Sequence, residues 1–134
     1  MTRLAAFALA AATTLPGGYD PTVWEDHVAD FFPADQVETA LCVIGWESGG
    51  NPHLINDSEP HTGGSVGLFQ IAADNWAGRY RIAGLERWPT VTLTQARRLL
   101  RDYPTINIAA AAAIWRANGW LPAWRAQKHR CGLR

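Results

Sequence analysis

Glu47 is the residue of this chain whose type and position best suit acid–base chemistry. Apolar residues, among them Leu41 and Ile44, recur before it at helical spacing. We therefore expect Glu47 at the border of a buried helix face, in the last turn before Gly49-Gly50 ends the helix. Burial and the negative end of the helix dipole both raise a carboxyl pKa, as a general acid near neutral pH requires. From position alone, an ordinary solvated glutamate is the favoured alternative.

Three motifs, in a fixed order, begin at Glu47. They are ESGGNP at 47–52, GLFQI at 67–71 and PTINIAA at 104–110, with IWRANGW at 114–120 after them. The first resembles the catalytic motif of the lytic transglycosylase family, within the lysozyme-like superfamily. The second and third resemble that family's Gly-Leu-Met/Phe-Gln and Asp-Pro-x-x-Asn-Ile segments, and 114–120 replaces its Ala-Tyr-Asn-Ala-Gly segment. The resemblance covers roughly residues 36–124.

The resemblance implies a fold and an activity. The fold would be mainly α, of the α+β lysozyme-like kind, with a small irregular hairpin or loop region after the catalytic helix. The substrate would be the glycan strands of peptidoglycan, cut at the β-1,4 bond between N-acetylmuramic acid and N-acetylglucosamine. Glu47 would protonate the leaving oxygen and then accept the proton of the muramyl C6 hydroxyl, giving a 1,6-anhydro product.

Four further site residues are implied by position in these motifs. Gln70 and Ser65 would line the sugar cleft, and Asn107, in the same substrate-binding set, would help order the long helix against the catalytic one. Trp115 takes the place of the family's tyrosine, whose hydroxyl helps orient the catalytic carboxyl. This is a departure from the family pattern, because an indole N–H donates a hydrogen bond but cannot accept one.

A lysozyme would need a second carboxylate, and Asp57 and Glu59 are the candidates. They follow Glu47 by ten and twelve residues, in a polar loop. The two carboxyls of a retaining glycosidase stand about 5–5.5 Å apart, and those of an inverting one roughly 6.5–9.5 Å. For Asp57 we favour a turn residue that caps its own loop, and so a single-carboxylate mechanism. Hydrolysis as in a muramidase, and a non-catalytic wall-binding domain, are the alternatives.

The N-terminus and the two cysteines indicate an exported protein. Residues 1–15 combine Arg3, an apolar stretch and small residues, which is typical of a secretion signal, with a buried N-terminal helix as the alternative. Cys42 and Cys131 are the only cysteines, and in an exported chain they predict a disulfide. The localisation expected is the cell wall or the extracellular space, or alternatively a phage virion.

The elements that must position these residues are mostly helices of one domain, residues 20–134. Capping signals and apolar spacing predict helices at the following places: Pro21 to before Pro33, Asp35 with Glu38 in a capping box to Gly49, about 72–78, Thr92 with Gln95 to about 101, Thr105 as cap of 106–118 with Gly119 at the end, and a short one opened by Pro122. Residues 51–66 are rich in turn formers and predict a loop or small hairpin.

Composition and charge exclude several classes of protein. Hydrophobic residues make up 48% of the 134, too many for a disordered chain, and no apolar run reaches the roughly 20 residues of a membrane span. The formal net charge of zero argues against a nucleic-acid binder, although residues 75–134 hold eleven of the twelve bases. We expect a monomer without a cofactor. His53, Asp57, Glu59 and His61 fit no established metal site, so no metal is expected.

Overall fold

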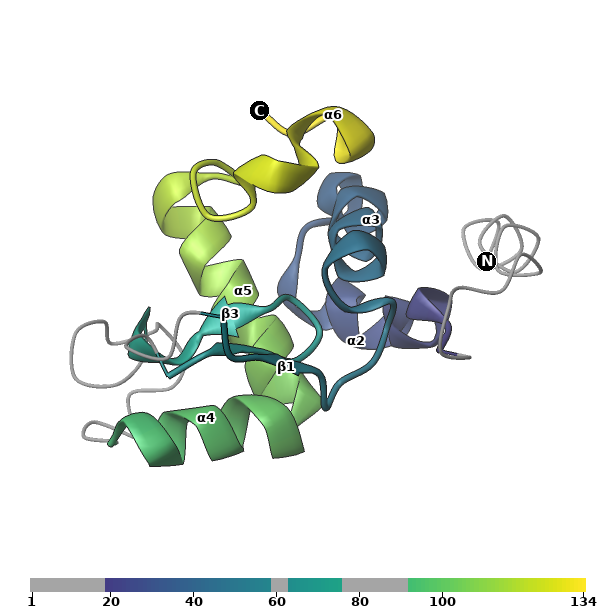
Figure 1. Ribbon diagram of the computed structural model, residues 1–134. Coiled ribbons are helices and arrows are strands. Elements are labelled where there is room, and N and C mark those ends of the chain that lie inside the picture. Colours follow the sequence, from purple (N-terminus) through teal and green to yellow (C-terminus); the bar gives the residue numbers. More distant parts are fainter. Residues whose placement is uncertain (1–18, 59–62, 76–91) are drawn as a thin grey trace.

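A computed structural model describes residues 19–58, 63–75 and 92–134 (Figure 1). It is mostly helical, with one small antiparallel sheet, as the sequence predicts. The predicted secretion signal at 1–15 lies outside the described residues. The α-helices of the described part are α2 (Glu25–Phe31), α3 (Val37–Ser48), α4 (Leu93–Asp102), α5 (Pro104–Asn118) and α6 (Lys128–Cys131). None of these helices is long and apolar enough to cross a membrane.

The N-terminal helix begins at the predicted cap. The Asp20 carboxylate accepts a hydrogen bond from the Thr22 backbone N–H at 2.9 Å and caps the 3₁₀-helix η1 (Pro21–Trp24), which leads into α2. Helix α2 ends at Phe31, just before Pro33. The predicted capping box of Asp35 and Glu38 is wrong, because a 3₁₀ turn, η2 (Ala34–Gln36), comes first and α3 begins without a side-chain cap.

The segment after α3 forms the predicted hairpin and one strand more. Strands β1 (Ile55–Asn56), β2 (Ser65–Val66) and β3 (Ile71–Ala72) pair antiparallel in that order. The turn from β2 to β3 contains two residues with positive φ, Gly67 at 73° and Gln70 at 49°. Of the helix predicted at 72–78, the structure describes the 3₁₀-helix η4 (Ala73–Asn75), and the rest lies outside the described residues.

Sequence signals predict the start of α4 correctly but not the start of α5. The capping box of Thr92 and Gln95 is present at the start of α4. The predicted cap at Thr105 is wrong, because Pro104 already occupies the first turn of α5 and its fixed φ suits that place. Gly119 ends α5, as predicted. Pro122 does not open a helix directly: a turn with a cis Leu121–Pro122 bond precedes η5 (Arg125–Gln127) and α6.

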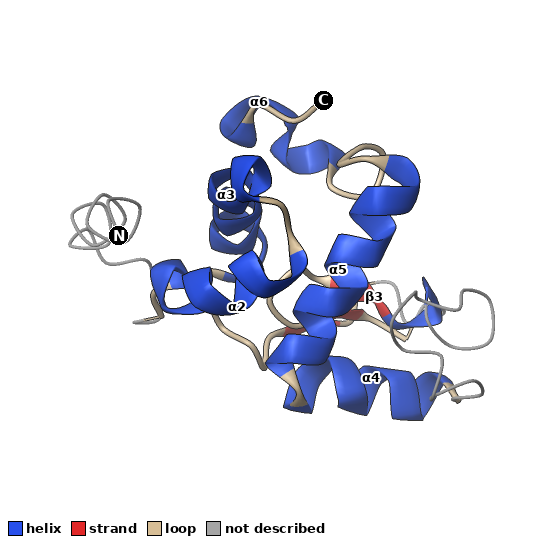
Figure 2. Cartoon of the chain, turned by 180° about the vertical axis from the view of Figure 1, so that it is seen from behind, coloured by secondary structure: helices blue, strands red, loops and turns tan. Residues whose placement is uncertain are grey.

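An aromatic cluster holds the helices together. Helix α2 contacts both α3 and α5 (Figure 2), and Phe32, just after α2, stacks on Phe69 and Trp120 with ring centroids 5.8 and 5.4 Å apart. Trp124 packs edge-on against both of those rings. Because these rings are almost fully buried, they join α2, the β2–β3 turn and the chain after α5 into one core.

The predicted disulfide is present between Cys42 of α3 and Cys131 of α6. The two residues are 89 apart in sequence, and their Cα atoms are 5.7 Å apart. The bond fixes the C-terminal segment over α3, which Figure 1 shows as the yellow end of the chain above the blue helix. Closing a loop of this length stabilises a fold by about 4–5 kcal/mol in the chain-entropy account.

Candidate active site

Glu47 lies in the last turn of α3 and is partly buried. Burial raises the pKa of its carboxyl above the ordinary value of 4.5, because the charged form loses hydration. A hydrogen bond with the Gln127 side chain acts in the opposite direction and lowers the pKa, without cancelling the effect of burial. A carboxyl that keeps its proton to a higher pH is what a general acid requires.

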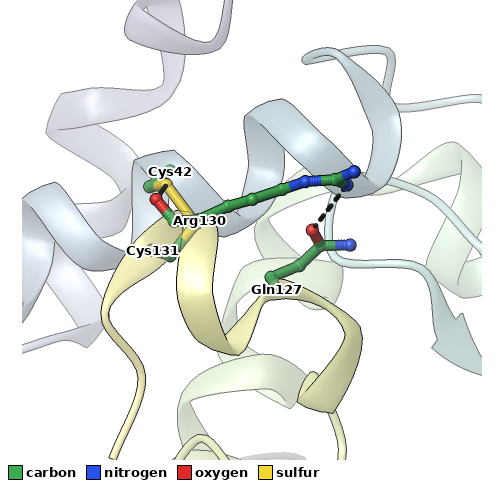
Figure 3. Close-up of a disulfide and its surroundings, with 4 residues drawn as sticks. All are labelled: Cys42, Gln127, Arg130 and Cys131. Atoms are coloured by element: carbon green, nitrogen blue, oxygen red, sulfur yellow. Dashed lines mark hydrogen bonds between the residues drawn. A yellow bond between two sulfur atoms is a disulfide. The ribbon is translucent and has the colours of Figure 1, made fainter.

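Gln127 is the partner of Glu47 that sequence reasoning missed. Its side chain is buried, with 5% of the residue exposed. Arg130 Nη1 donates a hydrogen bond to Gln127 Oε1 at 3.4 Å, as Figure 3 shows beside the disulfide. With the carboxamide oxygen engaged by Arg130, the NH₂ group is the end of Gln127 able to act as a donor to Glu47, and a donor favours the charged carboxylate and so lowers its pKa.

The end of α3 is held by the residues that follow Glu47 in the first motif. Ser48 Oγ is buried, donates to the Leu68 carbonyl at 2.8 Å and accepts from the Gly50 N–H at 3.2 Å. Gly49 takes the left-handed conformation that ends the helix. A side chain at Gly50 would meet the backbone of Asp20 and Pro21 at 2.9 Å. These residues position Glu47 by fixing the helix end against η1 and the β2–β3 turn.

Ser65 and Gln70 lie on strand β2 and the turn that follows it. Ser48, at the end of α3, contacts this turn through its hydrogen bond to Leu68. Both are partly exposed, Ser65 on β2 and Gln70 in the turn of residues 67–70. Gln70 Nε2 donates to the carbonyls of Leu54 and Gly67, at 3.0 Å each, so its NH₂ group holds this turn together. The Ser48–Leu68 hydrogen bond therefore joins this element to the end of α3, the helix that carries Glu47.

Asn107 has no surface to offer a sugar, in contrast to the substrate-binding expectation. It is fully buried, and its Nδ2 donates to the carbonyls of Val66 and Leu100 at 2.8 and 3.1 Å. Its Oδ1 accepts from the Phe69 N–H at 3.0 Å. Asn107 thus ties α5 to α4 and to the β2–β3 turn, rather than directly to α3.

Trp115 belongs to the aromatic cluster. Its ring lies 5.8 Å from that of Phe32 and 6.2 Å from that of Trp120. The contacts of the Trp115 ring are therefore with the aromatic core, and the side chain that affects the pKa of Glu47 is that of Gln127.

Asp57 is engaged in an ion pair on the surface. Its two oxygens accept from Arg97 Nη1 and Nη2 at 2.8 and 3.1 Å, and its side chain is 57% exposed. The turn expected at Asp57 is capped instead by its neighbour Asn56, whose Oδ1 accepts from the Ser58 N–H at 3.0 Å.

The other polar residues of this loop form no metal site that the structure describes. Glu59 and His61 lie outside the described residues. Within the described ranges, no group of three or more histidine, cysteine, aspartate or glutamate side chains could hold a metal ion.

Comparisons with protein-family models, with curated proteins and with solved structures found no match.

Proposed function

We propose that this protein is a lysozyme-like enzyme of the lytic transglycosylase type, which cleaves peptidoglycan glycan strands between N-acetylmuramic acid and N-acetylglucosamine. The observation that carries the proposal is the state of Glu47. It is a carboxyl with a raised pKa at the end of a rigid helix, at the head of the motif that resembles the family's catalytic segment.

The reaction needs one carboxyl that changes role. Protonated Glu47 gives its proton to the glycosidic oxygen, the bond from that oxygen to the muramyl C1 breaks, and positive charge develops on the sugar ring. The Glu47 carboxylate then takes the proton of the C6 hydroxyl while O6 bonds to C1. The glycan is left with a 1,6-anhydro end, and Glu47 regains its proton.

The ion pair of Asp57 supports this single-carboxylate mechanism over hydrolysis. A carboxylate whose two oxygens both accept hydrogen bonds from Arg97 is a weak nucleophile. Glu59 is the remaining candidate for a hydrolytic partner.

The disulfide supports a setting outside the cytoplasm, since such bonds persist in oxidising compartments. The cell wall or the extracellular space is the setting we propose, because it contains the substrate. A phage virion component would meet the same substrate.

Loss of turbidity of purified cell walls tests the proposal. Wild type is compared with Glu47→Gln, and Glu38→Gln serves as a matched control, because Glu38 is an exposed glutamate in the first turn of the same helix. We expect wild type and Glu38→Gln to clear the walls, and Glu47→Gln to lose at least about a hundredfold, as expected when an acid–base group is removed. Binding to walls without clearance by wild type would instead identify a non-catalytic wall-binding domain. Equal clearance by Glu47→Gln would remove Glu47 from the mechanism.

A further inference from the structure

Arg130 carries an exposed guanidinium group that two contacts hold in place. Its Cζ lies 4.3 Å from the centroid of the Trp46 ring, and Nη1 donates to Gln127 Oε1. Within the part of the chain that the structure describes, Arg130 forms no ion pair with a carboxylate. A planar guanidinium fixed by stacking presents its other N–H groups as a fork that matches the oxygens of a carboxylate or phosphate.

The segment around Arg130 is positive and contains no acidic residue. Four of its bases are exposed, and none of them is paired with an acid of the described residues: Arg125, Lys128, Arg130 and Arg134. On α4, in contrast, Arg97 and Arg101 each contact an aspartate. The positive potential of residues 125–134 is therefore available to an anion from outside the chain.

The position of this guanidinium links it to Glu47. Arg130 lies over the ring of Trp46, the residue directly before Glu47 in α3, and it donates to Gln127, whose side chain lowers the pKa of the Glu47 carboxyl. Trp46 is 56% exposed and provides an aromatic surface next to the guanidinium of Arg130.

We propose that Arg130, held on Trp46, forms an anion subsite for a carboxylate attached to the glycan strand on which Glu47 acts. The carboxylate of a peptide linked to the muramyl residue has this chemistry and arrives with the sugar. The inference rests on the proposed function, because the glycan is what brings the carboxylate beside Glu47. Phosphodiester polymers of the wall carry a similar anion, so the experiment includes them.

The experiment measures binding in the Glu47→Gln background, so that the glycan is not cleaved. The probes for calorimetric titration are a peptide-bearing glycan fragment with free carboxylates, the same fragment with its carboxylates amidated, and a glycerol-phosphate oligomer. Arg130→Ala and Arg130→Lys are compared with Lys128→Ala, which removes an exposed charge of the same helix. Arg130→Lys keeps the charge but loses the planar fork, and it provides a second variant should Arg130→Ala fold poorly.

We expect Arg130→Ala to weaken binding of the free-carboxylate fragment roughly tenfold or more, as for the loss of a charge-assisted hydrogen bond. Arg130→Lys should also weaken it, whereas Lys128→Ala should change it less than about twofold, because rim charges contribute little affinity. The amidated fragment should bind equally to all variants.

Three results would overturn the subsite. If Arg130→Ala and Lys128→Ala lose the same affinity, the anion is attracted by the general positive charge of the segment and not by a site at Arg130. If Arg130→Ala binds the free-carboxylate fragment as wild type does, Arg130 makes no contact with it. If the phosphate oligomer binds more tightly than the fragment, and this binding needs Arg130, the ligand is a phosphate and not a carboxylate. Failure of the proposed function is distinguishable from these. Arg130-dependent binding without wall cleavage by wild type would leave the subsite standing and remove the enzymatic activity.

Discussion

The side chain of Gln127, close to the C-terminal end of the chain, lowers the pKa of the Glu47 carboxyl and so acts against burial, which raises it. The Cys42–Cys131 disulfide fixes the segment that carries Gln127 on the helix that carries Glu47. Arg130 occupies the carboxamide oxygen, so that the donor end of Gln127 remains for Glu47. The proton affinity of the candidate acid is thus set by two opposed influences, its own burial and a partner oriented by the C-terminal segment.

Gln127→Leu tests this relationship. Leucine has about the size of glutamine but no N–H group to stabilise the charged carboxylate. The pKa of Glu47 should therefore rise above its wild-type value. NMR titration of the Glu47 side-chain carboxyl measures the change directly, and the alkaline limb of the pH–activity profile should move to higher pH with it. Ala126→Leu, a neutral change at an exposed neighbouring position, is the control. A pKa that stays or falls in Gln127→Leu would contradict the assigned hydrogen bond.

The raised pKa of Glu47 also predicts a pH-dependent cost to stability. As pH rises above 4.5, the unfolded chain releases the Glu47 proton before the folded chain does, so this group's contribution to stability falls until the folded pKa is passed. Glu47→Gln removes the titration. The melting temperature of Glu47→Gln minus that of wild type should therefore increase from acidic to neutral pH. A difference that is constant with pH would mean that Glu47 is not perturbed by folding.

Asn107→Ala should reduce stability while leaving the candidate site's chemistry intact in the folded fraction. It leaves buried partners of three hydrogen bonds unsatisfied, which costs about 2–4 kcal/mol. Asn118→Ala, at the exposed end of α5, should change the free energy of unfolding by less than about 0.5 kcal/mol. Urea denaturation measures both. A stable Asn107→Ala protein that binds glycan poorly would restore this residue to the substrate-binding set.

Asp57→Asn should retain wall-clearing activity. The change breaks an exposed ion pair with Arg97, which contributes about 0.2–1 kcal/mol to stability. Arg97→Gln breaks the same pair from the other side and should behave alike. Loss of activity in Asp57→Asn alone would indicate that the carboxylate takes part in the reaction, and would favour a lysozyme mechanism.

Sequence alone predicts the features that local chemistry decides. The cap at Asp20, the capping box of Thr92 and Gln95, and the helix-ending Gly49 and Gly119 each act within one turn of the chain. Where two local signals competed at the start of α5, the fixed φ of Pro104 decided the boundary. Two-residue strands such as β3 have no periodicity to detect.

The surroundings of Glu47 depend on contacts between distant segments, and the sequence predicts them only in part. The two cysteines indicate that the C-terminus meets α3, but not that Gln127 would be the side chain placed on Glu47. Nothing in the local pattern around Gln127 distinguishes it from a solvated glutamine. The buried position of Asn107 likewise follows from three partners on different elements.

The masses of the fragments released from purified cell walls test the central claim most directly. We predict that the wild-type protein releases muropeptides whose glycan ends are lighter by one water than reducing ends, and that Glu47→Gln releases none. Fragments with reducing ends only would show hydrolysis with a second carboxylate, and release of the same fragments by Glu47→Gln would contradict the role assigned to this acid.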